Sequence, residues 1–130
     1  MTSIFPLGDP PPEALAAYWQ AIDDGCFRVA AACFSRDALY AAPLSGEDET
    51  APRTVTTGSA TLLERFVDER RAPGRHTALL CLTDGRDTLV EGLVRDLANE
   101  PVSTYVCSVR TAADGCVPHK ACSRHVMIAR

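Results

Sequence analysis

Hydrophobic residues recur at intervals of three and four near the start of the chain, which is the spacing of one face of an amphipathic helix. This face consists of Leu15, Tyr18, Trp19, Ile22 and Cys26. It predicts a helix that begins at about Pro11 or Pro12 and ends at Asp24, because Pro is favoured in a first turn and Gly25 is typical of a helix stop. Asp23 and Asp24 then lie at the helix end where the macrodipole disfavours carboxylates. The two acids therefore either point into solvent or belong to one wall of a pocket.

The next segments predict two further helices and one strand. A short Ala-rich helix is expected at 27–34, and alternation over 37–43 predicts a strand. Residues 44–57 are acidic, contain Pro and Gly and show no periodicity, so they are predicted to form a loop. A third helix is expected over 58–74, from a Gly-Ser start to an Ala-Pro-Gly stop. Its apolar face consists of Leu62, Leu63, Phe66 and Val67.

From residue 75 onward the pattern changes to strands and turns. The predicted strands are 75–83, 88–97, 102–111 and 116–128. The first two are joined by an Asp84-Gly85 turn, a strong hairpin signal. Three helices followed by a four-strand meander predict an α+β fold. Residues 1–12, which contain four prolines, are expected to be a leader, and residues 13–130 a single domain.

Composition narrows the classes of partner. The chain has 130 residues, of which 46% are hydrophobic, enough for the core of one domain. A net charge of −4 does not indicate the basic surface that binds nucleic acid or anionic lipid. No apolar run approaches the roughly 18 residues of a membrane helix, and no secretory signal pattern opens the chain. We therefore expect a cytoplasmic protein that binds neither nucleic acid nor membrane.

The six cysteines are expected to be reduced and structural. No pair has CxxC spacing, and no His lies at zinc-finger spacing from a cysteine pair. The cysteines among apolar neighbours, where a thiol behaves as a small hydrophobe, are Cys26, Cys33, Cys81 and Cys107. His119 and His125 are six residues apart, a spacing that does not suffice to chelate one metal. We expect neither a metal nor a cofactor.

The order of the predicted elements resembles the nuclear transport factor 2-like superfamily over about residues 13–128. The resemblance rests on Tyr18 followed by Asp23 and Gly25, on Phe34-Ser-Arg-Asp37-Ala38-x-Tyr40, on Gly58 before the third helix, and on Arg75-His76 leading to Asp84-Gly85. This superfamily includes ketosteroid isomerases, polyketide cyclases, scytalone dehydratase and a hexachlorocyclohexane dehydrochlorinase. The resemblance implies a cone in which a curved, mostly antiparallel sheet wraps the helices around an apolar cavity. It also implies a homodimer through the sheet.

The similarity to ketosteroid isomerases does not extend to their chemistry. Tyr18 matches the tyrosine that donates a hydrogen bond to the developing enolate in that family. The position of the family's carboxylate base is taken by Ala42, and that of its protonated Asp by Cys107. A methyl group cannot remove a proton and a thiol is a poor hydrogen-bond donor, so two of the three parts are missing.

The Asp–His pair of scytalone dehydratase and the dehydrochlorinase is matched better. Asp23 falls at the position of the carboxylate that orients a His, and His76 at the position of the His that removes a proton during elimination. A carboxylate on one ring nitrogen fixes the tautomer and strengthens the other nitrogen as a base. The structural alternative is a hydrogen-bonded His76 at the start of a strand and a solvated Asp23. Tyr18 and Asp23 lie roughly 140° apart around the helix, whereas Trp19 and Asp23 share a face.

Several other side chains are expected to line a cavity for a small apolar or aromatic ligand. They are Tyr18, Trp19, Tyr40, Tyr105, Cys107, Lys120 and Cys122. The ketosteroid isomerase register turns Lys120 and Cys122 inward, and a slip by one residue would turn this face outward. Three functions stay open: a cofactor-independent lyase, isomerase or cyclase, a non-catalytic ligand-binding or dimerisation module, and an accessory domain that binds a protein through the sheet.

Overall fold

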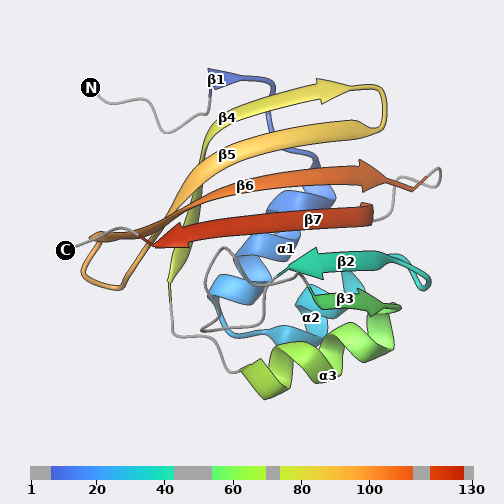
Figure 1. Ribbon diagram of the computed structural model, residues 1–130. Helices are drawn as coiled ribbons and strands as arrows, with labels where there is room; N and C mark the ends of the chain where they lie inside the picture. The colour runs from blue at the N-terminus through green and yellow to red at the C-terminus, as the bar shows by residue number, and fades with distance from the viewer. Residues whose placement is uncertain (1–6, 43–53, 70–73, 113–117, 128–130) are drawn as a thin grey trace.

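The computed structural model describes residues 7–42, 54–69, 74–112 and 118–127 (Figure 1). Its helices and strands are β1 (Leu7–Gly8), α1 (Glu13–Asp23), α2 (Phe27–Ala32), β2 (Leu39–Ala42), β3 (Thr54–Thr57), α3 (Ser59–Glu69), β4 (Arg75–Asp84), β5 (Asp87–Arg95), β6 (Pro101–Thr111) and β7 (Pro118–Met127). The fold is α+β, with the curved sheet and packed helices that the sequence predicts.

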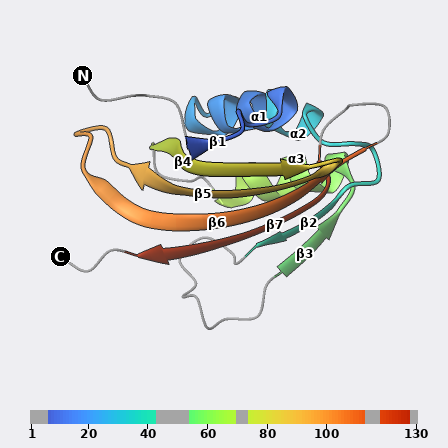
Figure 2. The ribbon, with the colours of Figure 1, turned by 90° about the horizontal axis from the view of Figure 1, so that it is seen from above.

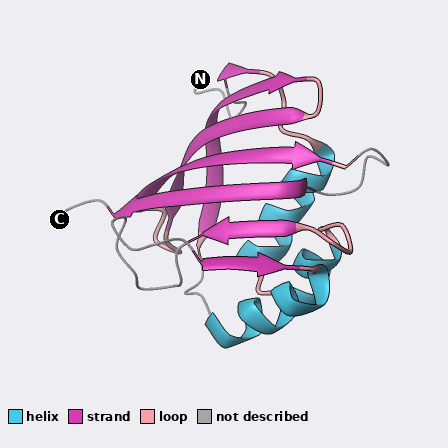
Figure 3. Cartoon of the chain, turned by 45° about the vertical axis from the view of Figure 1, so that its right-hand side comes forward, coloured by secondary structure: helices cyan, strands magenta, loops and turns pink. Residues whose placement is uncertain are grey.

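One seven-stranded sheet, in the order β1-β4-β5-β6-β7-β2-β3, organises the described residues. Strands β4 to β7 form an antiparallel meander, whereas β2 runs parallel to β7 and β1 runs parallel to β4. The sheet curves around the helices (Figure 2), and all three helices lie on one of its sides (Figure 3). We call the helix-covered side of the sheet the inner face and the opposite side the outer face.

Alternation along the meander defines these two faces. Cys81, Val90 and Cys107 lie next to one another across β4, β5 and β6, and all three are buried on the inner face. Leu82, which follows Cys81, and Leu89, which precedes Val90, are about half exposed on the outer face. The sheet therefore has one face in the core and one face uncovered in the monomer.

The end of α1 is fixed by its backbone. Gly25 has φ of +74°, the left-handed conformation that favours glycine, and the Cys26 N–H donates to the Ala21 carbonyl oxygen at 2.8 Å. The predicted stop at Gly25 is therefore present. Asp23 is the last residue of the helix, so its side chain lies where α1 meets the sheet.

Two strands lie where the sequence predicts none. β3 forms inside the predicted 44–57 loop, because its Thr-Val-Thr-Thr run is β-branched but too short to show alternation, and it pairs with β2. β1 lies in the predicted leader and adds two residues to the edge of β4. Gly8 is required there, since a Cβ would collide with the Cys81 carbonyl oxygen and its φ is +87°.

Candidate functional site

Asp23 and His76 meet where the last turn of α1 touches the start of β4. The His76 backbone N–H donates to Asp23 Oδ2 at 2.8 Å, and the ring Nδ1 lies 2.7 Å from Oδ1. The Asp23 side chain is 13% exposed and the His76 side chain is 10% exposed. A carboxylate accepts hydrogen bonds, so this contact favours the tautomer with the proton on Nδ1 and a lone pair on Nε2. Asp23 and His76, which the family resemblance places in one pair, are therefore in contact.

The contact also explains an acid at an unfavourable helix position. The C-terminal end of a helix carries partial negative charge, which disfavours Asp23. Two N–H groups from His76 point at its carboxylate and offset that field. Asp24 is stabilised differently, because it is exposed and accepts a 2.8 Å hydrogen bond from Gln20 Nε2. The neighbouring acids thus have different roles: one joins α1 to the sheet, and the other accepts a hydrogen bond from a side chain of the same helix.

Two aromatic side chains enclose the imidazole. The Trp19 ring is nearly parallel to it, with 6.2 Å between centroids and 7° between planes. The Tyr105 ring approaches edge-on, at 5.3 Å and 64°. Trp19 and Tyr105 also touch each other, at 5.7 Å and 61°. We name Trp19, Asp23, His76 and Tyr105 the histidine cluster. It matches the expectation that Trp19 and Asp23 share a helix face.

Burial keeps the Tyr105 phenol protonated. Only 2% of this residue is exposed, and burial raises its pKa well above the ordinary value, with charge on Cys107 and Asp23 acting in the same direction. The histidine cluster therefore contains a phenol that stays protonated well above neutral pH.

Tyr18 and Tyr40 belong to a second group of rings. Both pack against Phe34 and Phe66 at centroid distances of 5.0 to 6.0 Å, and their hydroxyl oxygens are 3.4 Å apart. We name Tyr18, Phe34, Tyr40 and Phe66 the core cluster, because residues of α1, α3 and β2 meet there with Phe34, which follows α2. The expected lining residues are therefore divided between two aromatic clusters.

The last three expected lining residues differ in their place on the sheet. Cys107 is buried on the inner face, two residues from Tyr105. The backbone register pairs Lys120 with Arg110 and Cys122 with Ser108. The inward placement of Lys120 and Cys122 stays a prediction, because their side chains lie outside the described part of the chain.

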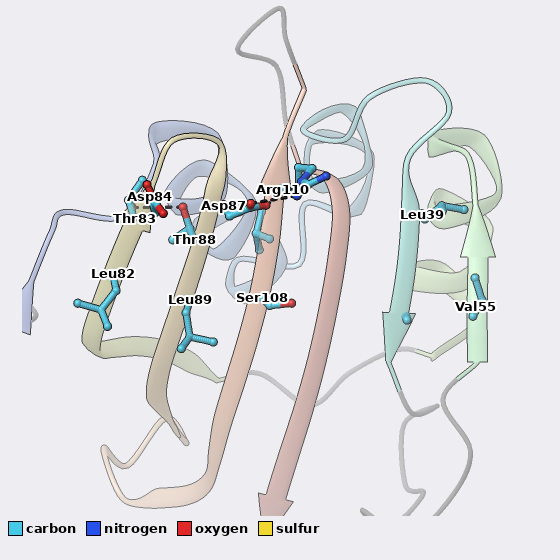
Figure 4. A pocket seen from close by; sticks show the side chains of 12 residues that line it. Leu39, Val55, Leu82, Thr83, Asp84, Asp87, Thr88, Leu89, Ser108 and Arg110 are labelled. Atoms are coloured by element: carbon cyan, nitrogen blue, oxygen red, sulfur yellow. Dashed lines mark hydrogen bonds and ion pairs between the residues drawn. The ribbon is translucent and has the colours of Figure 1, made fainter.

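A groove of about 810 Å³ lies on the outer face, away from the histidine cluster (Figure 4). Its walls are mostly aliphatic and come from β2, β3, β4 and β5: Leu39, Val55, Leu82 and Leu89. At one end Arg110 pairs with Asp87 through Nε at 2.7 Å and Nη2 at 3.0 Å. The groove therefore combines an apolar floor with an exposed ion pair.

Gly92 is a residue of the site that the sequence analysis did not single out. It lies beneath the Tyr105 ring on the inner face, paired with Tyr105 across β5 and β6. A lone glycine within an alternating strand is a signal for close approach of another group, and this signal was available.

Within the described residues, no three His, Cys, Asp or Glu side chains are grouped to hold a metal ion. None of the described helices is long and apolar enough to span a membrane.

Comparison with known proteins shows the fold of the chain. No protein-family model and no curated protein sequence matches it. A protein from Catenulispora acidiphila with a ketosteroid isomerase-like fold, solved with trimethylamine, is similar at TM-score 0.69 and 12% identity over 88% of this chain and 86% of that one. A nuclear transport factor 2-like protein of unknown function from Burkholderia xenovorans is similar at 0.64 and 18%, over 91% and 84%. A candidate polyketide cyclase from Sinorhizobium meliloti is similar at 0.64 and 22%, over 88% and 95%.

Proposed function

We propose that this chain, which has the nuclear transport factor 2-like fold, is a cofactor-independent enzyme of the lyase, isomerase or cyclase kind. Its general base is His76, oriented by Asp23. The observation that supports this proposal is the double hydrogen bond from the His76 backbone and ring to one poorly exposed carboxylate. A histidine held in this way is a feature of sites that move protons.

In the proposed reaction the His76 ring removes a proton from the ligand and later returns it. With Nδ1–H donated to Asp23, the lone pair on Nε2 removes a proton from a carbon acidified by a neighbouring carbonyl group. The C–H electron pair passes into an enolate, or into a new double bond as a leaving group departs. The imidazolium that forms is stabilised by the Asp23 carboxylate, then returns the proton to another carbon or to the leaving oxygen. The cycle restores the neutral imidazole, so protons balance without a cofactor.

The proposed ligand is small and apolar or aromatic. Trp19 and Tyr105 contribute two aromatic surfaces beside His76, and Cys107 adds an apolar thiol nearby. Aromatic faces and a few polar groups are typical of small-molecule sites. The similar Sinorhizobium meliloti protein is a candidate polyketide cyclase, which is compatible with an aromatic or cyclic ligand. The alternative is a non-catalytic ligand-binding module that uses the same cluster without proton transfer.

We also propose a homodimer that forms through the outer face. Four aliphatic residues on this face, from β3 to β6, are between 45% and 62% exposed: Val55, Leu82, Leu89 and Val106. Exposed apolar surface of this kind is typical of association sites. A second copy would cover this surface and leave the histidine cluster on the inner face of each subunit.

Paired substitutions distinguish the enzyme from the binding module. We expect His76→Gln to lower turnover of a substrate found by screening carbonyl-containing ring compounds by about 10²- to 10⁴-fold, the usual contribution of a general base. Asp23→Asn should lower turnover by a similar order because it no longer fixes the tautomer. The matched control is Asp24→Asn, one residue along the same helix end. Equal turnover in wild type and His76→Gln would exclude the proposed base.

A further inference from the structure

The side chain of Tyr105 lies across a strand because the residue beneath it has no side chain. Ala78, Gly92 and Tyr105 are neighbours across β4, β5 and β6 on the inner face. A Cβ at Gly92 would lie 2.5 Å from Cζ and 2.6 Å from the hydroxyl oxygen of Tyr105. The outer end of the tyrosine therefore rests on the Gly92 backbone, and the ring leans from β6 towards β4.

This direction brings Tyr105 against His76. β4 carries His76 at its start, and the two ring centroids are 5.3 Å apart. Trp19 covers the imidazole from the helix side in a nearly parallel stack. Asp23 restrains the imidazole at Nδ1, but one hydrogen bond from the ring does not by itself fix the rotation of the ring about its Cβ–Cγ bond. Contacts with two rings at different angles restrict that rotation.

We propose that Tyr105, seated on Gly92, is a positioning residue that sets the plane of the His76 ring and so directs Nε2. The inference deepens the proposed function and rests on it, since orientation of Nε2 matters for a base. Tyr105 acts through its ring contacts and requires no hydrogen bond from its hydroxyl group. An incorrectly oriented imidazole would still bind Asp23 but would present its lone pair to the ligand less often.

A second buried tyrosine provides a control that separates positioning of His76 from the general effect of removing a ring from the core. Tyr40 is also a buried tyrosine, 3% exposed compared with 2% for Tyr105, and it packs against rings of the core cluster. Tyr40→Leu and Tyr105→Leu therefore remove similar buried rings and should destabilise the fold to similar extents. Only Tyr105→Leu removes a ring in contact with His76.

The test measures exchange of the His76 Nδ1 proton with water, by proton–nitrogen NMR of protein labelled with ¹⁵N. We expect Tyr105→Leu to raise the exchange rate about tenfold, the size expected for loss of one aromatic contact, and to increase the population of the other tautomer. Tyr105→Phe, which keeps the ring, and Tyr40→Leu should stay within about twofold of wild type. The inference is overturned if Tyr105→Leu stays within about twofold, or if Tyr40→Leu matches its increase.

Gly92→Ala provides a second variant. Its Cβ would displace the Tyr105 ring and also collide with the Thr77 carbonyl oxygen. The variant therefore tests whether the contact of Tyr105 with Gly92 positions the ring, but the second collision can prevent folding. If Gly92→Ala folds, its His76 Nδ1 proton should exchange as fast as in Tyr105→Leu. A rate equal to that of wild type would contradict the proposed support of Tyr105 by Gly92. If it does not fold, Tyr105→Leu decides. No substrate enters these measurements, so faster exchange together with unchanged turnover in His76→Gln would support positioning and reject the proposed function.

Discussion

Asp23 stabilises the contact between α1 and β4 through two hydrogen bonds that cross from helix to sheet. Asp24 makes only a local, exposed hydrogen bond within its own helix end. Hydrogen bonds to a charged group contribute about 1.5–3 kcal/mol when they are poorly exposed, whereas exposed ones contribute far less. The two neighbouring acids therefore offer a direct comparison at the scale of one residue.

We expect Asp23→Asn to lower the free energy of unfolding by about 1–2 kcal/mol, because an amide keeps one acceptor and loses the charge. Asp24→Asn should change it by less than about 0.5 kcal/mol. Urea unfolding followed by circular dichroism measures both. An equal loss in the two variants would show that the contact with His76 does not stabilise the fold.

A buried phenol and a buried thiol predict how the free energy of unfolding changes with pH in the alkaline range. Burial raises the pKa of the Tyr105 phenol above its ordinary value of 10.0 and that of the Cys81 thiol above 9.0. Both groups stay neutral in the folded chain while they ionise in the unfolded chain. Their contribution is complete below the unfolded pKa and is lost as the pH rises through the folded pKa.

The free energy of unfolding should therefore fall as the pH rises above about 9, and more steeply above about 10. Tyr105→Phe should weaken the dependence above pH 10, since it removes the phenol and keeps the ring. Urea unfolding at a series of pH values from 7 to 11 provides the measurement. Identical slopes above pH 10 in wild type and Tyr105→Phe would contradict the burial of a neutral phenol.

Among the elements, the helices, β2 and the meander strands could be predicted from sequence, whereas β1 and β3 could not. The face of α1 and the four meander strands follow from spacing alone, because periods of 3.6 and 2 persist over enough residues to be recognised. β3 has four residues and β1 has two, so neither contains a recognisable period. Both form because an existing strand offers unpaired backbone groups, which is tertiary information.

The candidate site was predictable to a similar degree. Asp23 and His76 could be paired by position within a known arrangement of elements, because both lie at element ends with clear signals. The lean of Tyr105 depends on the space above Gly92, on the strand next to that of His76. The lone glycine signals the close approach of another group but does not say which group approaches. The face predicted for Lys120 and Cys122 rests on a strand register, and a slip by one residue inverts the alternation without changing the residues, so spacing alone does not determine it.

The end of α1 yields an element-scale prediction. Gly25 has φ of +74° and a Cβ there would meet nothing within 4 Å, so Gly25→Ala should cost only the backbone strain, about 1 kcal/mol. Gly85, with φ of +60° and equally open space, is the matched control in the β4–β5 turn. Equal losses in urea unfolding are expected, with Nδ1 exchange of His76 altered only in Gly25→Ala. Altered exchange in Gly85→Ala would contradict this local coupling.

At the scale of the molecule, the two faces of the sheet divide the proposed roles. The inner face holds the histidine cluster beneath the helices, while the outer face carries the apolar groove. Charge inserted into an apolar interface is costly, since the group loses its hydration. The homodimer proposal can therefore be tested by substitutions that leave the inner face untouched.

We expect Leu82→Asp together with Leu89→Asp to convert a dimer to a monomer in sedimentation experiments, with little change in circular dichroism. Val29, exposed on α2 at 57%, gives the control variant Val29→Asp, which should leave the dimer intact. A wild-type protein that sediments as a monomer at all concentrations would contradict association through the outer face.

Proton removal from carbon by His76 is tested most directly by deuterium incorporation from heavy water into a bound ring compound with an acidic C–H group. This exchange reports C–H cleavage even when no net product forms. We expect wild-type protein to incorporate deuterium, and His76→Gln to do so about 10²- to 10⁴-fold more slowly while it still binds the ligand. Equal incorporation in the two proteins, or none into any ligand that binds beside His76, would contradict its role as a base.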